Sequence, residues 1–320
     1  MKEDMNKCAH PTSIGGEALI EGVMMKGPEN IAIAIRKPDG EILVDKKPLR
    51  TLSKRHKFFK LPLVRGAVGI FESMVIGVQS LMYSAEFFEV EEDHPSEPSK
   101  LDKFLERVLG EKLQSAVIYF SVLVAMAFSI GLFILLPNVV AGLMNFDRHT
   151  PGGVLYYNLF EGALRVLLFI GYIILISKMK DVRRVFEYHG AEHKTIHCYE
   201  HEEELTVENV KKYTTRHPRC GTAFLLVVML VSILVFSFTG WHNMVLNIIF
   251  RLLLLPLVAG LSYEVIKYAG RNQGRMMRIV SAPGLALQRF TTREPDDRQI
   301  EVAIAALKNV LVDDPDADRW

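Results

Sequence analysis

Long apolar segments dominate the middle of the chain. Four of them approach the roughly 20 residues that a helix needs to cross the hydrocarbon core of a bilayer. They cover residues 115–140, 154–177, 222–239 and 244–267. Because only short connections separate the members of each pair, the pattern predicts two helical hairpins. The expected fold class is therefore a mostly α, polytopic membrane protein.

The hydrophobic pattern is different before the first of these segments. Residues 31–36 and 41–45 are largely apolar and flank Pro38-Asp39-Gly40, which predicts a β-hairpin. The glycine-rich block at residues 15–27 suits a backbone that turns sharply or approaches a ligand closely, but it matches no phosphate-binding fingerprint. Residues 60–88 predict a long helix that is too polar for a span and fits an interfacial or bundle-packed position.

These patterns divide the chain into successive regions. Residues 1–88 form a mixed α/β cytoplasmic region, 89–103 an acidic linker, and 104–267 the membrane bundle with an inserted histidine-rich loop at 178–221. Residues 268–320 form a cytoplasmic tail, whose apolar positions after Pro295 predict an amphipathic helix that packs on the cytoplasmic domain. The last eight residues, rich in aspartate, are expected to fray.

The distribution of Lys and Arg predicts the orientation of the bundle. Nine of these residues lie in the connection 178–221, whereas connection 138–153 holds only Arg148 and connection 240–243 holds none. Both termini and the histidine-rich loop are therefore expected in the cytoplasm. The net charge of +1 gives no indication of nucleic-acid binding, and the three cysteines form no disulfide framework.

Two of the apolar segments contain ionisable residues. Such groups are costly in hydrocarbon unless they are paired or face a cavity. We expect Glu161 to pair with Arg251 or with Arg165, which follows it by four residues. The alternative is that these side chains extend to the outer interface.

The histidine-rich loop contains the pattern His189-Gly190-Ala191-Glu192-His193. On a helix, His189 and His193 lie on one face and can share a Zn²⁺ ion, while Glu192 can act as a general base on a water molecule. This H-x-x-E-H order occurs in inverzincin metalloproteases. A pattern with three fixed positions also arises by chance, and solvated histidines are the alternative.

A catalytic zinc ion usually has three protein ligands. Candidates for the third are His217 and Cys220 in His-Pro-Arg-Cys-Gly, and Glu264 at the inner end of the fourth apolar segment. Weaker candidates are Glu17, Glu21 and Glu72. If the second segment continued as a straight helix, its rise of about 1.5 Å per residue would carry His189 away from Cys220 and Glu264. We therefore predict a break near residues 178–181.

Several sequence blocks point to a known family. Gly-Gly-Glu-Ala-Leu-Ile-Glu-Gly-Val-Met-Met, Tyr-His-Gly-Ala-Glu-His-Lys, His-Pro-Arg-Cys-Gly-Thr and Pro-Gly-Leu-Ala-Leu-Gln-Arg-Phe-Thr-Thr-Arg-Glu-Pro occur in this order. The chain thus resembles, over nearly its whole length, the YqhQ-like family of bacterial membrane proteins of unknown function, described as predicted metal-dependent enzymes. The resemblance implies a divalent metal and carries over His189, Glu192, His193, His217 and Cys220 as motif positions.

Two functions remain open at this point. The first is a zinc-dependent hydrolase of the bacterial cell membrane that acts at the bilayer on a lipid-linked, peptide or membrane-protein substrate. The second is a membrane scaffold, assembly factor or transporter with a structural metal site.

Overall fold

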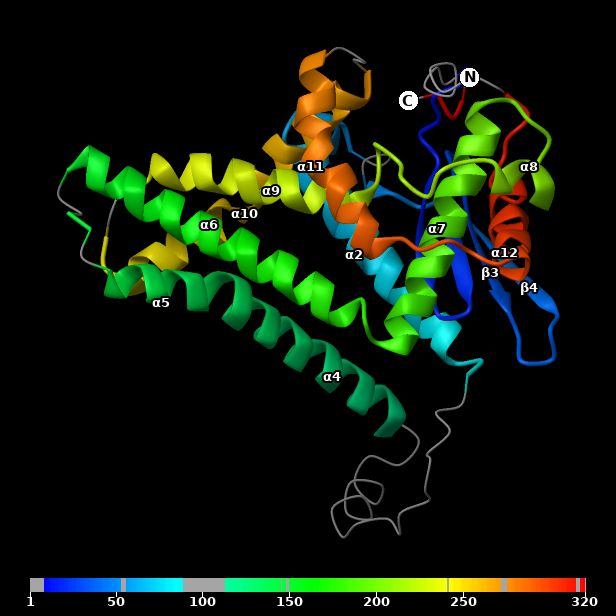
Figure 1. Ribbon diagram of the computed structural model, residues 1–320, viewed down its shortest axis with the longest axis horizontal. Coiled ribbons are helices and arrows are strands. Elements are labelled where there is room, and N and C mark those ends of the chain that lie inside the picture. Colours follow the sequence, from blue (N-terminus) through cyan, green and yellow to red (C-terminus); the bar gives the residue numbers. More distant parts are fainter. Residues whose placement is uncertain are drawn as a thin grey trace, which may run out of the picture.

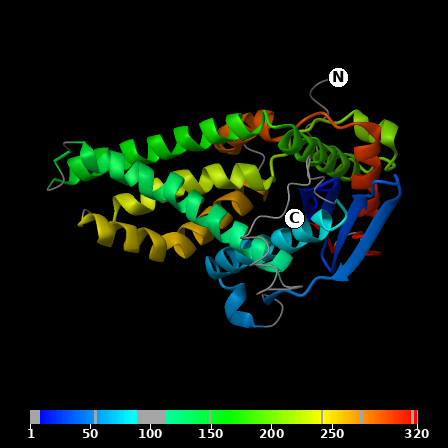
Figure 2. The ribbon, with the colours of Figure 1, turned by 90° about the horizontal axis from the view of Figure 1, so that it is seen from below.

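A computed structural model describes residues 9–52, 56–88, 113–144, 146–147, 150–240, 242–271, 275–314 and 317–319. The expected linker at residues 89–103 lies outside them. Figure 1 shows a helical bundle at one end of the molecule and a small sheet covered by helices at the other. The same division is visible from below in Figure 2.

The sheet is an antiparallel meander in the order β1-β2-β3-β4. Its strands are β1 (Gly15–Leu19), β2 (Gly22–Lys26), β3 (Asn30–Arg36) and β4 (Ile42–Pro48). The predicted β3–β4 hairpin is confirmed, and Gly40 in its turn has a φ of 89° that glycine adopts without strain. The glycine-rich block forms β1 and β2, which the sequence pattern did not reveal.

The apolar helices form the bundle. Their bounds are α2 Val64–Ala85, α4 Leu113–Ile130, α5 Leu136–Leu143, α6 Pro151–Ile176, α9 Gly221–Ser237 and α10 Met244–Arg271. A π-helical turn, η4 (Gly131–Leu135), joins α4 to α5, and a short 3₁₀ helix, η2 (Lys57–Lys60), precedes α2. The predicted segments therefore correspond to α4–η4–α5, α6, α9 and α10.

Within the described residues, four helical stretches are long and apolar enough to cross a membrane: α2, α4 through α5, α6 and α10. This set differs from the predicted one in two members. The α9 helix is apolar but has only 17 residues, at the lower limit for a span. The α2 helix is more apolar than its charged residues suggested, and it packs on α10.

The remaining helices are α7 (Lys180–Glu200), α8 (Val207–Lys211), α11 (Arg275–Thr291) and α12 (Asp297–Lys308). The predicted break is confirmed, because Met179 is extended (ψ 137°) between α6 and α7, and the chain turns sharply there (Figure 1). The predicted amphipathic helix is α12, which packs on α7, β2 and β3.

The sheet has a hydrophobic layer on each face. On one face, Val23 and Ala34 pack with Tyr188 of α7 and Ile300 of α12. On the other face, residues including Met24 and Ile33 pack with Ile76 and Tyr83 of α2. The sheet is thus held between α7 and α12 on one side and α2 on the other.

The prediction that the last eight residues fray is wrong for Asp318. This side chain is buried and accepts hydrogen bonds from Thr12 (2.7 Å) and Tyr199 (2.9 Å). It also lies 2.7 Å from His10 Nε2. A chain end rich in aspartate looks solvated in sequence, but a distant set of donors gives this one carboxylate a buried position.

The ion pair predicted within the apolar segments forms with both candidate partners. Glu161 is buried and receives hydrogen bonds from Arg165 (2.5 Å) and from Arg251 (2.6 Å). Arg165 also donates to the Phe133 carbonyl and to Ser232. This network connects α6 with η4, α9 and α10, so the two predicted hairpins share one polar core.

Candidate metal centre

His189 and His193 lie one turn apart on α7, and the backbone fixes both rings. The Nδ1 atom of His189 lies 2.8 Å from the Thr291 carbonyl, and Nδ1 of His193 lies 2.6 Å from the Thr215 carbonyl. Since a carbonyl only accepts, each Nδ1 must carry the proton, which leaves each Nε2 with a free lone pair in the neutral ring. Metal-binding histidines commonly have such a partner on the other nitrogen.

Gly190 allows the segment after α11 to approach this face of α7. A Cβ atom on Gly190 would overlap the carbonyl oxygen of Arg293, whose amide donates to the Phe186 carbonyl (2.8 Å). The crossing brings Thr291 to His189. The glycine therefore has a structural reason that outweighs its cost of about 1 kcal/mol within a helix.

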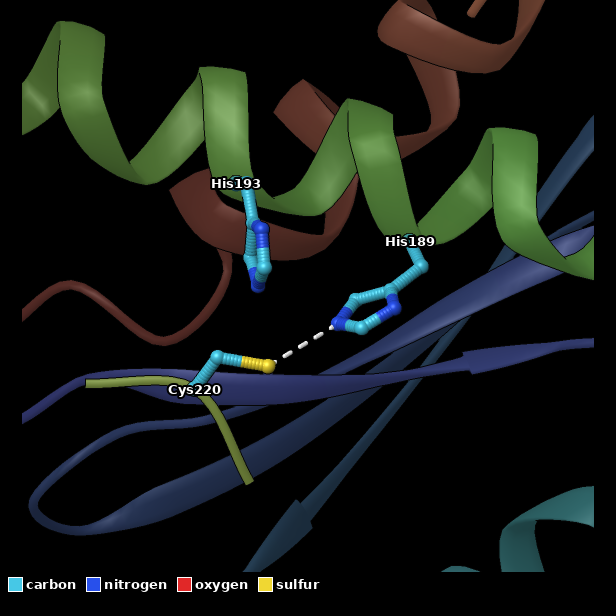
Figure 3. A group of neighbouring side chains, drawn as sticks. All are labelled: His189, His193 and Cys220. Carbon is cyan, nitrogen blue, oxygen red and sulfur yellow. Dashed lines mark hydrogen bonds between the residues drawn. The ribbon is translucent and has the colours of Figure 1, made fainter. Parts of the chain in front are cut away.

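Cys220 approaches the two histidines from the start of α9. Its Sγ lies 3.2 Å from His189 Nε2, and the ligand atoms of His189, His193 and Cys220 all lie within 4.8 Å of one another (Figure 3). Cys220 is the N-cap of α9, where its sulfur accepts from the Thr222 amide. This group is one of two sets of side chains in the described residues that could hold a metal ion.

The electrostatics of the group favour a thiolate. Burial alone would raise the pKa of the Cys220 thiol, but His189 and His193 outweigh this effect and hold it well below its usual value. The pKa of His189 shifts in the other direction. Burial would lower this pKa, but the charge of Cys220 raises it to about 9. Without a metal, a proton on His189 thus balances the thiolate, and a cation could replace that proton.

Glu192 faces the same space. Its carboxylate is buried, and Oε2 has no hydrogen-bond partner among the described residues, although the Gly16 amide bonds the carboxyl group. Burial raises the pKa of Glu192, and the two neighbouring histidines partly offset this effect. A Cβ on Gly16 would lie only 3.0 Å from the Glu192 carboxyl carbon, so glycine makes room for this group.

A cavity of about 370 Å³ lies against these residues. Its wall combines the edge of the sheet at Gly15–Ala18 with His189, Glu192, His193 and Cys220. This volume is within the range of roughly 300–1,000 Å³ that small-molecule sites occupy. The group therefore borders a space in which a substrate could bind.

The structure does not place His217 among the ligands of this group. His217 Nε2 lies 3.3 Å from Glu200, and its Nδ1 accepts from the Arg219 amide at 3.4 Å. Both ring nitrogens thus have partners, although the ring lines the same cavity. Gln288 of α11 clamps the His217 backbone with two hydrogen bonds of 2.8 Å each.

His217 belongs instead to the second set, with His197 and Glu200, which also has its ligand atoms within 4.8 Å. Here a cation is already present, because the Arg219 guanidinium donates to Glu200. The Thr12 amide donates to the same carboxylate at 2.9 Å. We interpret this second set as a hydrogen-bonded support for the turn that carries Cys220.

The structure does not bring Glu264 to the site, because its carboxylate pairs with Arg65 of α2 through two hydrogen bonds of 2.7 and 2.6 Å. The weaker candidates also have other positions. Glu21 pairs with Arg184, Glu72 accepts from the Leu52 amide, and Glu17 lines the cavity wall. The supporting carbonyls of Thr215 and Thr291 and the Gln288 clamp had no recognisable signal in the sequence.

Comparison with known proteins agrees with the resemblance of the motifs. The family model for a protein of unknown function (DUF1385) matches residues 61–313. The chain belongs to this family. It is 34% identical over 310 residues to the uncharacterized protein YqhQ of Bacillus subtilis (strain 168), which covers 96% of this chain and 95% of that protein. No solved structure matches the chain.

The Glu200 network predicts a specific loss of stability in acid. Burial would raise the pKa of Glu200, but the hydrogen bond from His217 and the charge of Arg219 lower it from 4.5 to about 2. A carboxylate with a depressed folded-state pKa stabilises the fold above its unfolded value, and this contribution is lost as the pH falls through the folded value. Thermal unfolding of detergent-solubilised protein should therefore show stability that declines between about pH 4.5 and pH 2.

The stability of Glu200→Gln should decline less steeply over this pH window than that of the wild type. The stability of Glu41→Gln, which changes an exposed carboxylate, should decline with the same slope as that of the wild type. Equal slopes for all three proteins would contradict the role of Glu200.

Proposed function

We propose that this chain is a membrane-associated, metal-dependent hydrolase in which His189, His193 and Cys220 bind zinc and Glu192 is the general base. One observation carries the proposal. The Nδ1 atoms of both histidines meet backbone carbonyls, so both Nε2 atoms are left for a ligand, and Cys220 Sγ lies within the same 4.8 Å group.

The donor set fits zinc. Tetrahedral geometry with Zn–N and Zn–S bonds of about 2.0 and 2.3 Å places the nitrogen and sulfur atoms roughly 3.5 Å apart, close to the 3.2 Å between His189 Nε2 and Cys220 Sγ. Three protein ligands leave a fourth position free, which is typical of catalytic rather than structural zinc. When bound, zinc would supply a Lewis acid that polarises the group under attack.

Glu192 supplies the second part of the chemistry. Its buried carboxylate has an unpartnered Oε2 atom, and the residue lines the same cavity as the three ligands. A carboxylate whose pKa is raised by burial is a stronger base once ionised. It would take a proton from water as the water attacks the substrate.

The apolar helices suggest association with a membrane. With the positive-inside distribution of Lys and Arg, we propose a multi-pass protein whose sheet, α7 and both termini lie in the cytoplasm. Because α7 follows α6 directly after the break at Met179, the metal group would lie close to the inner membrane surface. Lipid-linked molecules, peptides and membrane proteins are the substrate classes that fit this position.

Metal analysis of the purified full-length protein tests the proposal. Wild-type protein should retain about one zinc ion per chain, and His193→Ala and Cys220→Ala should lose it, because two remaining ligands bind weakly. Two matched controls should keep the metal: His56→Ala, at an exposed histidine, and Cys198→Ala, at a buried cysteine outside the group. Absence of zinc from the wild type, or its retention in the His193 variant, would overturn the assignment.

Glu192→Gln separates an enzyme from a scaffold with a structural metal. In the proposed hydrolase this variant keeps zinc and thermal stability but loses its function, since a general base typically contributes a factor of about 10²–10⁴ in rate. Complementation of a strain that lacks the protein provides the readout. A scaffold would instead keep its function, and loss of zinc would show that Glu192 is a ligand.

A further inference from the structure

A second cavity of about 340 Å³ lies between β1 and α2. Its wall is formed by Glu17, Ala18, Leu19, Met74, Gly77, Val78 and Leu81, so Glu17 is its one ionisable side chain. We call this cavity the α2 groove. Its accessible wall is mostly apolar and offers few hydrogen-bonding groups, which suits a hydrocarbon chain rather than a polar molecule.

The α2 groove is next to the cavity of the metal group. Glu17 and Ala18 line both cavities. Since successive side chains of a strand point to opposite faces, these two neighbours lie on the two sides of β1. A ligand in the α2 groove would therefore need to pass only the edge of this strand to reach Glu192.

The other side of the α2 groove is continuous with an exposed apolar surface. Phe71 and Val78 are 64% and 41% exposed, and Met74 and Leu81 of the same helix are also exposed. Spacings of three and four residues place these four side chains on one face of α2. The helix is itself long and apolar enough to enter a bilayer, so lipid chains are the apolar groups that would meet this surface.

We propose that the α2 groove binds the hydrocarbon chain of a membrane lipid and directs its polar head toward His189, His193 and Cys220. The inference rests on the proposed function, for which it selects one substrate class. A peptide would need main-chain hydrogen bonds along its length. Only the edge strand β1 could supply them, because the backbone groups of α2 are paired within the helix, whereas the apolar side chains of the wall favour a hydrocarbon chain.

Glu17 is compatible with such a ligand. Burial and the charge of Glu192 raise the pKa of Glu17 to about 7, although Lys26 opposes this shift. A carboxyl group that is half protonated near this pH costs less beside a hydrocarbon chain than a fully ionised carboxylate would. Gly77 leaves room for it, because a Cβ at that position would overlap the Glu17 carboxyl group.

Photolabelling tests the proposal. Full-length protein would be reconstituted into phosphatidylcholine vesicles that contain a phospholipid with a diazirine on its acyl chain, and labelled residues would be identified by peptide mass spectrometry. Glu17 is the decisive position, because it is partly exposed, lines the α2 groove and lies against Gly77 of α2, whereas Leu19 is 1% exposed and out of reach. A lipid chain must enter the groove to reach Glu17, so we expect label at Glu17 as well as at exposed Phe71.

Val78→Trp fills the α2 groove and should reduce labelling at Glu17 by about fivefold or more, since overpacking a site costs at least about 1 kcal/mol. Phe71→Trp, on the same helix but outside the groove, should leave this labelling unchanged. The proposal is overturned if Glu17 remains unlabelled while Phe71 is labelled, or if Val78→Trp has no effect. It is also overturned if a diazirine-bearing apolar peptide labels Glu17 and the phospholipid does not.

Zinc content measured in the same samples keeps the two proposals apart. Val78→Trp should retain zinc, because Val78 lines the α2 groove and not the cavity of the metal group. Labelled Glu17 in a zinc-free wild type would overturn the metal assignment alone. Zinc-loaded protein without label at Glu17 would overturn the lipid assignment alone.

Discussion

Replacement of Glu161 by glutamine should destabilise the folded protein by about 3–5 kcal/mol. The glutamine keeps the shape of the side chain but removes the negative charge between Arg165 and Arg251, both of which are buried. Two guanidinium groups would then repel each other inside the bundle, where the surrounding apolar side chains offer little solvation. Thermal unfolding in detergent, followed by circular dichroism, measures the loss.

The control removes all three charges together. A triple variant with Glu161→Gln, Arg165→Met and Arg251→Met should recover much of the lost stability, because apolar residues of similar volume often replace a buried ion network without penalty. Glu41→Gln, which breaks an exposed pair with Lys37, should leave the unfolding temperature unchanged. If the single Glu161 variant unfolds at the wild-type temperature, the network contributes nothing to the stability of the bundle.

The sequence predicted those parts of the structure that local rules determine. The pairing of Glu161 followed from the cost of an isolated charge in an apolar segment, and the structure confirms it with both partners. The break at Met179 followed from the reach of a straight helix. The spacing of His189 and His193 on one helix face required only the periodicity of an α-helix.

The features of the site that the sequence did not predict depend on contacts that residue identity does not encode. The carbonyls of Thr215 and Thr291 orient the two histidines, and every residue has a carbonyl, so no sequence pattern marks these positions. Glu264 lies at a suitable depth for the site, but depth does not determine which side of a helix it occupies. In the structure Arg65 of α2 binds it.

The turn that carries Cys220 illustrates the same limit at short range. His217 and Cys220 are three residues apart and are both good zinc ligands, so sequence could not separate them. The structure distinguishes the two residues by their partners in distant parts of the sequence. Glu200 of α7 and Gln288 of α11 hydrogen-bond His217. Cys220 instead contacts His189. The candidate site is therefore assembled by α7, α9 and α11 together, and its geometry depends on how closely these elements approach.

At Gly190 the chain after α11 lies directly against the backbone of α7, and Gly190→Ala should reduce both stability and zinc retention. Helix propensity alone predicts that alanine stabilises α7 by about 1 kcal/mol. The Cβ atom, however, would overlap the backbone carbonyl of Arg293, and a backbone segment cannot avoid the overlap by changing a rotamer. We expect a net destabilisation of about 2–3 kcal/mol, together with displacement of the Thr291 carbonyl from His189.

Gly171→Ala provides the matched control, because Gly171 also lies within a helix and a Cβ atom there meets nothing within 4 Å. This variant should be as stable as the wild type or slightly more stable, and it should keep its zinc. Thermal unfolding and zinc content of both variants can be measured on the same preparations. A stabilised Gly190→Ala protein with full zinc content would show that the crossing of α7 by the chain after α11 does not position His189.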